Sequence, residues 1–138
     1  MSLHPSPAPA KAIVFWVIWF AILSGLFVIQ LFVGGGIPEG PDQGQAPLVF
    51  IAAGSVAAFA SLLVRFLILP SKKSLEQKLP LMIISLALAE APGIAAAVVV
   101  PHGFAQTRLW MFLAAVGCVI ISAPVYAKEE PRNGGYMQ

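Results

Sequence analysis

Charged residues are scarce in this sequence: they make up 10% of its 138 residues, whereas apolar residues make up 59%. A soluble domain carries about 25% charged residues. A soluble fold of this size could not cover its surface with so few charges, so lipid is the expected surroundings for the excess apolar area. The net charge of +2 is too small to indicate a nucleic-acid partner.

Cysteine and catalytic motifs are also missing. The single cysteine, Cys118, lies in an apolar run, so it has no partner for an intramolecular disulfide or for a metal pair. His4 and His102 have no metal-ligating companion at helical spacing. The sequence contains no nucleophile–base pair, phosphate-binding loop, HExxH, CxxC or haem motif. These absences predict a protein that is not an enzyme and that uses no metal or other cofactor.

Four long apolar runs dominate the chain. They cover residues 12–33, 47–69, 80–100 and 108–126. Each contains at most one charged residue, and a helix needs about 20 residues to cross the hydrocarbon core of a bilayer. The sequence therefore predicts an all-α integral membrane bundle of four transmembrane helices. A flexible segment over 1–11 is expected to precede it, and a polar tail over 127–138 to follow it.

Lysine and arginine are distributed unevenly between the two sides of such a bundle. Four crossings place both termini and the 71–79 loop on one side. Seven basic residues lie on or near that side: Lys11, Arg65, Lys72, Lys73, Lys78, Lys128 and Arg132. The other side has only Arg108, and its 34–46 loop carries Glu39 and Asp42. Because basic residues favour the cytoplasmic side, both termini are predicted to be cytoplasmic.

Small residues recur every four positions along the third run. This ladder consists of Ser85, Ala89, Gly93 and Ala97. Small residues let helices in lipid approach closely, and similar rows occur in 47–69. These two runs are therefore expected to pack as a tight antiparallel hairpin. The 12–33 run is bulkier and richer in aromatic residues, which suits a more lipid-facing position.

Prolines mark both the helix starts and a bend. Pro47 and Pro80 are expected in the first turns of their helices, where a missing N–H does no harm. Pro92 falls inside the third helix, where it removes a backbone donor and leaves the carbonyl of Leu88 without its helical partner. A local bend is therefore expected near mid-depth.

Glu90 lies near the middle of the 80–100 run, and three interpretations of it remain open. A charged side chain at this depth costs roughly 2.5–3.5 kcal/mol on insertion scales, so it requires a reason. Glu90 is an ion- or proton-binding site in the first interpretation. In the second it is a neutral or paired residue that fixes helix packing through a hydrogen bond. In the third it meets a polar group of another subunit.

Arg65 is the nearest obvious partner for Glu90 by depth. The two residues are separated by about 8 Å along the membrane normal at 1.5 Å per residue, a gap that a long arginine side chain largely closes. In the alternative, Arg65 extends its guanidinium toward the cytoplasmic headgroups while its aliphatic part stays in lipid.

The two central runs resemble the hairpin of subunit c, the proton-ring subunit of rotary ATP synthases. The basic loop PSKKSLEQKLP leads to SLALAEAPGIAAAVVV, in which Ser85, Leu86, Ala87, Glu90 and Ala91 match that family's carboxylate motif. The resemblance implies a proton-carrying role for Glu90. It covers only the second and third runs, and Gly54 alone stands for the family's glycine-rich helix. The layout also resembles four-helix bacterial membrane proteins with an ALAEA segment, which implies a bacterial inner membrane.

The first functional hypothesis is a small non-enzymatic membrane protein, self-associated or joined to other membrane subunits, in which Glu90 binds or relays a proton or cation. The second is an accessory or scaffolding subunit of a larger membrane complex, with Glu90 serving helix packing. A small-solute transporter or channel is a further alternative.

Overall fold

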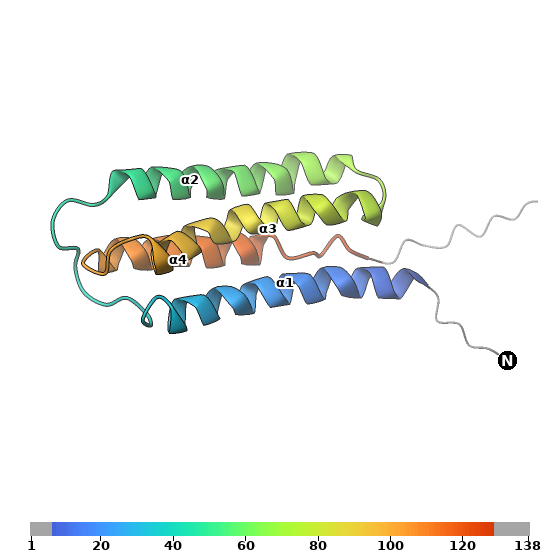
Figure 1. The fold of residues 1–138 in the computed structure, drawn as a ribbon. Coiled ribbons are helices and arrows are strands. Elements are labelled where there is room, and N and C mark those ends of the chain that lie inside the picture. The colour runs from blue at the N-terminus through green and yellow to red at the C-terminus, as the bar shows by residue number, and fades with distance from the viewer. Residues whose placement is uncertain (1–6, 129–138) are drawn as a thin grey trace, which may run out of the picture.

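The computed structural model describes residues 7–128, which form an all-helical bundle (Figure 1). Its elements are α1 (Pro7–Phe32), α2 (Leu48–Leu63), a π-helical turn (Val64–Ile68), a 3-10 turn (Leu69–Ser71), α3 (Leu75–Val98) and α4 (Ala105–Ile121). The described part contains no β-strand, only an isolated bridge between Asp42 and Phe104. The predicted all-helical fold with four helices is therefore confirmed.

Both ends of the described chain lie at one end of the bundle, beside the connection between α2 and α3 (Figure 1). We refer to this as the terminal end. The opposite, distal end holds the connections 33–47 and 99–104. The expected flexible start covers 1–11, but α1 already begins at Pro7, and residues 1–6 lie outside the described part. Most of the expected polar tail, residues 129–138, also lies outside it.

Three of the helices are long and apolar enough to cross a membrane: α1, α3, and α2 together with its π and 3-10 turns. The apolar helix α4 is shorter, with 17 residues, or about 25 Å. It ends at Ile121, whereas the apolar run continues to Tyr126. Pro124 accounts for the difference, because it disfavours the helical conformation at the residue before it.

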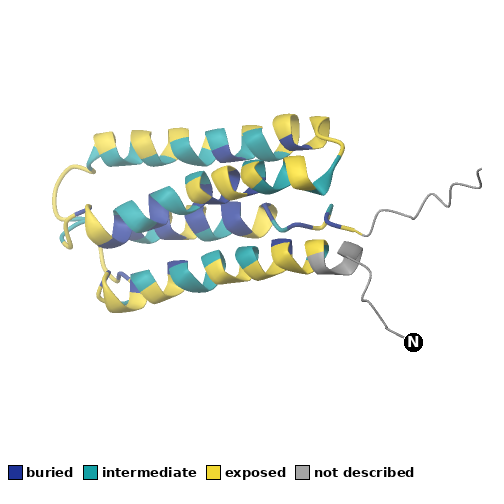
Figure 2. Ribbon diagram, turned by 45° about the vertical axis from the view of Figure 1, so that its right-hand side comes forward, coloured by how far each residue is buried: buried dark blue, intermediate teal, exposed yellow. Residues whose placement is uncertain are grey.

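α3 occupies the centre of the bundle. Of its most apolar stretch, 44% is buried, against 11% in α1 and 6% in α2. In Figure 2 the buried residues concentrate in the middle of the bundle, and the outward faces of the outer helices are exposed. Those exposed faces are rich in large apolar side chains. This is the distribution expected of a bundle whose outside is solvated by hydrocarbon.

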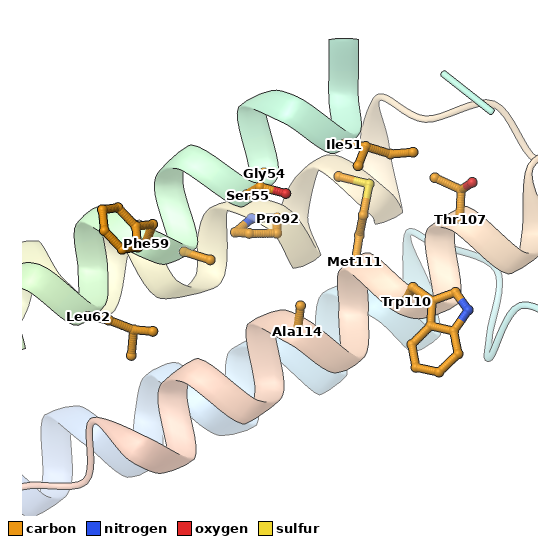
Figure 3. A pocket seen from close by; sticks show the side chains of 11 residues that line it. Ile51, Gly54, Ser55, Phe59, Leu62, Pro92, Thr107, Trp110, Met111 and Ala114 are labelled. Carbon is orange, nitrogen blue, oxygen red and sulfur yellow. The ribbon is translucent and has the colours of Figure 1, made fainter. Parts of the chain in front are cut away.

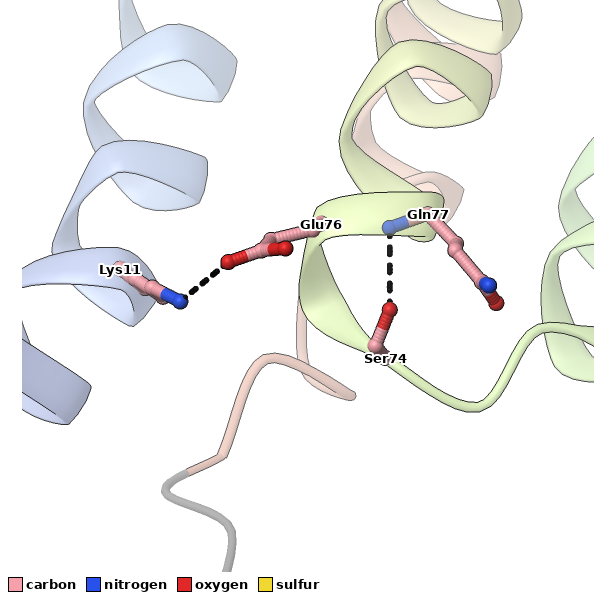
Figure 4. Close-up of polar contacts among 4 residues, drawn as sticks. All are labelled: Lys11, Ser74, Glu76 and Gln77. Atoms are coloured by element: carbon pink, nitrogen blue, oxygen red, sulfur yellow. Dashed lines mark hydrogen bonds and ion pairs between the residues drawn. The ribbon is translucent and has the colours of Figure 1, made fainter.

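The start of α3 differs from the expected start at residue 80. Ser74 caps the helix by accepting a hydrogen bond of 3.3 Å from the backbone N–H of Gln77 (Figure 4). Glu76 lies in the first turn, where a negative charge complements the helix dipole. The sequence Ser-Leu-Glu-Gln has the spacing of a capping box. α3 therefore begins at Leu75, and Pro80 lies in its second turn rather than in its first.

A reciprocal pair of serines joins α2 to α3. The hydroxyl of Ser61 donates to the carbonyl of Ser85 at 2.8 Å, and the hydroxyl of Ser85 donates to the carbonyl of Ser61 at 3.1 Å. Gly54, seven residues before Ser61, lies against Pro92, seven residues after Ser85. The hairpin expected from the small residues is thus present, in antiparallel register.

All four residues of the α3 ladder are buried, but they do not all face α2. A Cβ atom at Gly93 would lie 2.5 Å from Cδ1 of Leu26 in α1 and 3.0 Å from Cβ of Ala115 in α4. A row with four-residue spacing is inclined to the helix axis. The ladder therefore begins against α2 at Ser85 and turns toward α1 and α4 at Gly93, which places α3 in contact with every other helix.

Candidate functional site

Glu90 lies at the border between the buried and exposed faces of α3. One of its helical neighbours, Leu86, is fully buried, whereas another, Ala87, is exposed. The Glu90 side chain itself is half-buried. It makes no hydrogen bond or ion pair with any side chain or backbone group in the described part of the chain. A carboxyl group thus sits about two-thirds of the way along the central helix without a polar partner among the described residues.

Arg65 is not paired with Glu90. The π-helical turn between α2 and the 3-10 turn carries Arg65, and its Nη2 donates to the carbonyl of Ala123 at 3.3 Å. Its guanidinium also lies over the ring of Tyr126, 4.5 Å from the centroid. The side chain therefore reaches across to the segment that follows α4. Sequence depth alone could not reveal this, because a π-helical turn changes the direction in which its residues point.

Pro92 forms part of an open apolar groove of about 540 Å³ between α2 and α4 (Figure 3). Gly54 approaches Pro92 from α2, and Met111 and Trp110 border the groove from α4. Glu90 is not among its lining residues. Pro92 and Glu90, only two positions apart, thus face different sides of α3.

Arg108 is the buried charge whose role the sequence did not reveal. Only 3% of it is exposed. Its Nε donates to the carbonyl of Ala96 and its Nη2 to the carbonyl of Gly34, both at 2.7 Å. These carbonyls belong to the C-terminal ends of α3 and α1, where unpaired acceptors and the helix dipole favour a cation. Arg108 is thus a clamp joining three helices at the distal end.

Asp42 supplies the N-terminal cap of α4 from a distant loop. Phe104, at the cap position itself, offers no side-chain acceptor. Asp42 accepts from the hydroxyl of Thr107 at 2.5 Å and from its backbone N–H at 3.0 Å. These two bonds hold the pKa of Asp42 below its ordinary value near 3.8. The sequence indicates this cap only indirectly, because no residue next to the start of α4 could cap it and a cap must therefore come from elsewhere.

The other described carboxylate on α3, Glu76, is accounted for by an exposed ion pair. Nζ of Lys11 lies 2.6 Å from Oε1 of Glu76 and joins the N-terminal ends of α1 and α3 (Figure 4). Within the described residues, no group of three or more His, Cys, Asp or Glu side chains could hold a metal ion. Of the two described carboxylates on α3, Glu76 is thus paired, and Glu90 has no polar partner among the described residues.

Comparison of this chain with protein-family models, curated proteins and solved structures gave no match.

Proposed function

We propose that this chain is a small non-enzymatic multi-pass membrane protein in which Glu90 binds or relays a proton or a cation. The observation that carries the proposal is that Glu90, inside the central helix, has no polar partner among the described residues. In a bilayer this carboxyl group would lie near mid-depth, where charge is costly and where ionisable residues generally serve ion or proton pathways.

The location of Glu90 favours this role over helix packing within one chain. A packing role requires that the carboxyl group hold two helices together, as Arg108 does through Gly34 and Ala96. Glu90 makes no such bond to the described residues. Its half-buried position instead leaves it partly accessible from the outer surface of the bundle, where an ion or a group from a neighbouring subunit could reach it.

The proposal includes an orientation and a location. α1, extended α2 and α3 cross the bilayer, and α4 with the residues after it forms the fourth crossing. The terminal end faces the cytoplasm of a bacterial cell, in agreement with the basic residues Lys11, Lys72, Lys73 and Lys78 on that side. Non-helical backbone beyond Ile121 is acceptable at this depth because Ser122, Pro124 and Ala127 are buried against protein.

Proton flux into vesicles tests the ion-handling role. The full chain is reconstituted with a pH-sensitive dye inside, and flux is driven by a potential. Glu90→Gln keeps the size of the side chain and removes its titration, so we expect it to abolish the flux. Glu90→Asp keeps the carboxyl group and should retain part of the flux. Glu76→Gln, at the exposed ion pair on the same helix, is the matched control and should behave as wild type.

Two outcomes would contradict the proposal. One is a Glu90→Gln protein that conducts protons, or sodium in a parallel assay, as fast as the wild type does. The other is a wild-type protein that is folded and inserted but conducts neither ion. That second result would favour the accessory role, for which Glu90→Gln should weaken association with other membrane subunits.

A further inference from the structure

The segment that follows α4 closes the terminal end of the bundle. We call residues 122–127 the strap. It is irregular and turns back on itself through hydrogen bonds from Val125 N to Ala123 O at 2.8 Å and from Ala127 N to Pro124 O at 3.0 Å. Although it is not helical, Ser122, Pro124 and Ala127 are buried. The strap is therefore packed into the bundle rather than trailing from it.

Tyr126 joins the strap to the other helices, beside the Ala123 carbonyl that accepts a hydrogen bond from Arg65. Its ring packs edge-on against Phe15 of α1, with centroids 6.0 Å apart. The guanidinium of Arg65 lies 4.5 Å from the same ring, and Nζ of Lys78 in α3 lies 5.6 Å from it. One side chain thus contacts α1, the π-helical turn and α3. Such cation–ring and aromatic contacts are individually weak, so each can break at a small cost in free energy.

Polar groups without partners are concentrated at this same place. Four buried side-chain polar atoms in the described residues lack a hydrogen bond, and three of them belong to Ser122, Tyr126 and Arg65. A buried donor or acceptor without a partner destabilises the folded state, and a hydrogen bond to water would remove this cost. The closed strap is thus destabilised by three groups that would be satisfied if the strap moved away and water entered.

The helix that carries Arg65 is irregular in the same region. Val64–Ile68 is π-helical, and it is followed by the 3-10 turn Leu69–Ser71. Short π-helical turns occur frequently at functional positions because they redirect side chains at some cost in stability. Here the turn directs Arg65 onto Tyr126 and Ala123 of the strap.

We propose that the strap is a movable closure of the terminal end, with Tyr126 as its latch, and that it undocks as a unit to admit water to the bundle interior. The observations that carry this proposal are the irregular buried segment, the single latching ring and the three unpaired polar atoms around it. The proposal does not depend on what Glu90 does, because the strap would open whether or not an ion is bound there.

The single cysteine provides a built-in probe of this opening. Cys118 is 8% exposed and lies one turn before the strap, where its carbonyl accepts the backbone N–H of Ser122 at 3.0 Å. We would measure how fast a water-soluble maleimide labels Cys118 in the full chain, reconstituted in vesicles. Undocking of the strap should control this rate.

Three variants of the strap give the expected pattern. Tyr126→Ala removes the latch and should increase the labelling rate about tenfold. Tyr126→Phe keeps the ring and removes the unpaired hydroxyl, so it should slow labelling severalfold. Val125→Ala is the matched control, because Val125 lies in the same strap but is exposed, and it should label at the wild-type rate.

Arg65→Gln releases the latch from the other side and leaves the strap sequence intact, so it should also accelerate labelling. Thermal unfolding of every variant separates local opening from global unfolding. The proposal is overturned if Tyr126→Ala and Arg65→Gln label no faster than Val125→Ala. It is equally overturned if the labelling rates simply follow the unfolding temperatures. Either result would leave the flux assay on Glu90 unaffected.

Discussion

Arg108 and Arg65 occupy opposite ends of the same bundle, and their surroundings are built differently. Arg108 is almost fully buried and makes two hydrogen bonds of 2.7 Å to the ends of two helices. Arg65 makes one bond of 3.3 Å, and its buried Nε has no partner among the described residues. The comparison indicates that the distal end is a fixed joint, whereas the terminal end is held by contacts that can be exchanged.

Glu90 in α3 adds a third ionisable group to this comparison. Among the described residues it has neither the two hydrogen bonds of Arg108 nor the single hydrogen bond of Arg65. Structural charges inside a bundle are expected to be paired, because an unpaired one is costly. Among the described residues, Arg108 is thus fully paired, Arg65 is partly paired and Glu90 is unpaired. The proposed function rests on Glu90.

Removal of the arginine at each end of the bundle should change the free energy of unfolding by clearly different amounts, and this is the largest effect we expect. Arg108→Met leaves the carbonyls of Gly34 and Ala96 buried without a donor, so we expect a loss of about 3 kcal/mol or more in the free energy of unfolding. Arg65→Met removes one long bond and a cation–ring contact, and it should cost about 1 kcal/mol. Unfolding in mixed micelles titrated with a denaturing detergent measures both. Equal losses would show that the two ends do not differ.

The cap of α4 should give a smaller and pH-dependent effect. The folded-state pKa of Asp42 is lowered, so its stabilising contribution is complete above the unfolded-state pKa and is lost as pH falls through the folded-state value. Asp42→Asn should therefore lower the unfolding temperature at pH 7, and the difference from wild type should shrink below about pH 4. A difference that stays constant down to pH 3 would contradict the cap.

Replacement of Ser61 or Ser85 should give the smallest loss in the free energy of unfolding. Hydrogen bonds between transmembrane helices contribute about 0.6 kcal/mol on average. Ser85→Ala and Ser61→Ala should each cost about this amount, and the double variant should cost less than their sum, because the two hydroxyls also contact each other at 3.4 Å. A double-mutant cycle in the same unfolding assay checks this. Strict additivity would mean that the two serines do not act together.

Much of the architecture was predictable because it depends on local composition. Apolar runs and small-residue spacing predicted four helices and the hairpin of α2 with α3. The start of α3 was missed, although the pattern Ser-Leu-Glu-Gln from Ser74 to Gln77 is readable as a cap. The early end of α4 was also readable, since Pro124 stops a helix even where the apolar run continues.

The polar contacts were less predictable because they join distant parts of the chain. Asp42 and Thr107 are 65 residues apart, and Arg108 and Gly34 are 74 apart. No spacing in the sequence brings such pairs together before the helices pack. Depth along a straight helix suggested Arg65 as the partner of Glu90, but the π-helical turn directs Arg65 elsewhere. Glu90 itself was identifiable because a lone acid in an apolar run is conspicuous.

Carbodiimide labelling of the full chain in vesicles is the most direct test of the central claim about Glu90. The reagent is apolar and modifies protonated carboxyl groups, and mass spectrometry of peptides locates the adduct. If Glu90 is a proton-exchanging group open to the bundle surface, it should be modified near neutral pH, and the modified protein should lose its proton flux. Glu76, in its exposed ion pair, should remain unmodified. An unmodified Glu90 in folded, inserted protein, or full flux after its modification, would contradict the account.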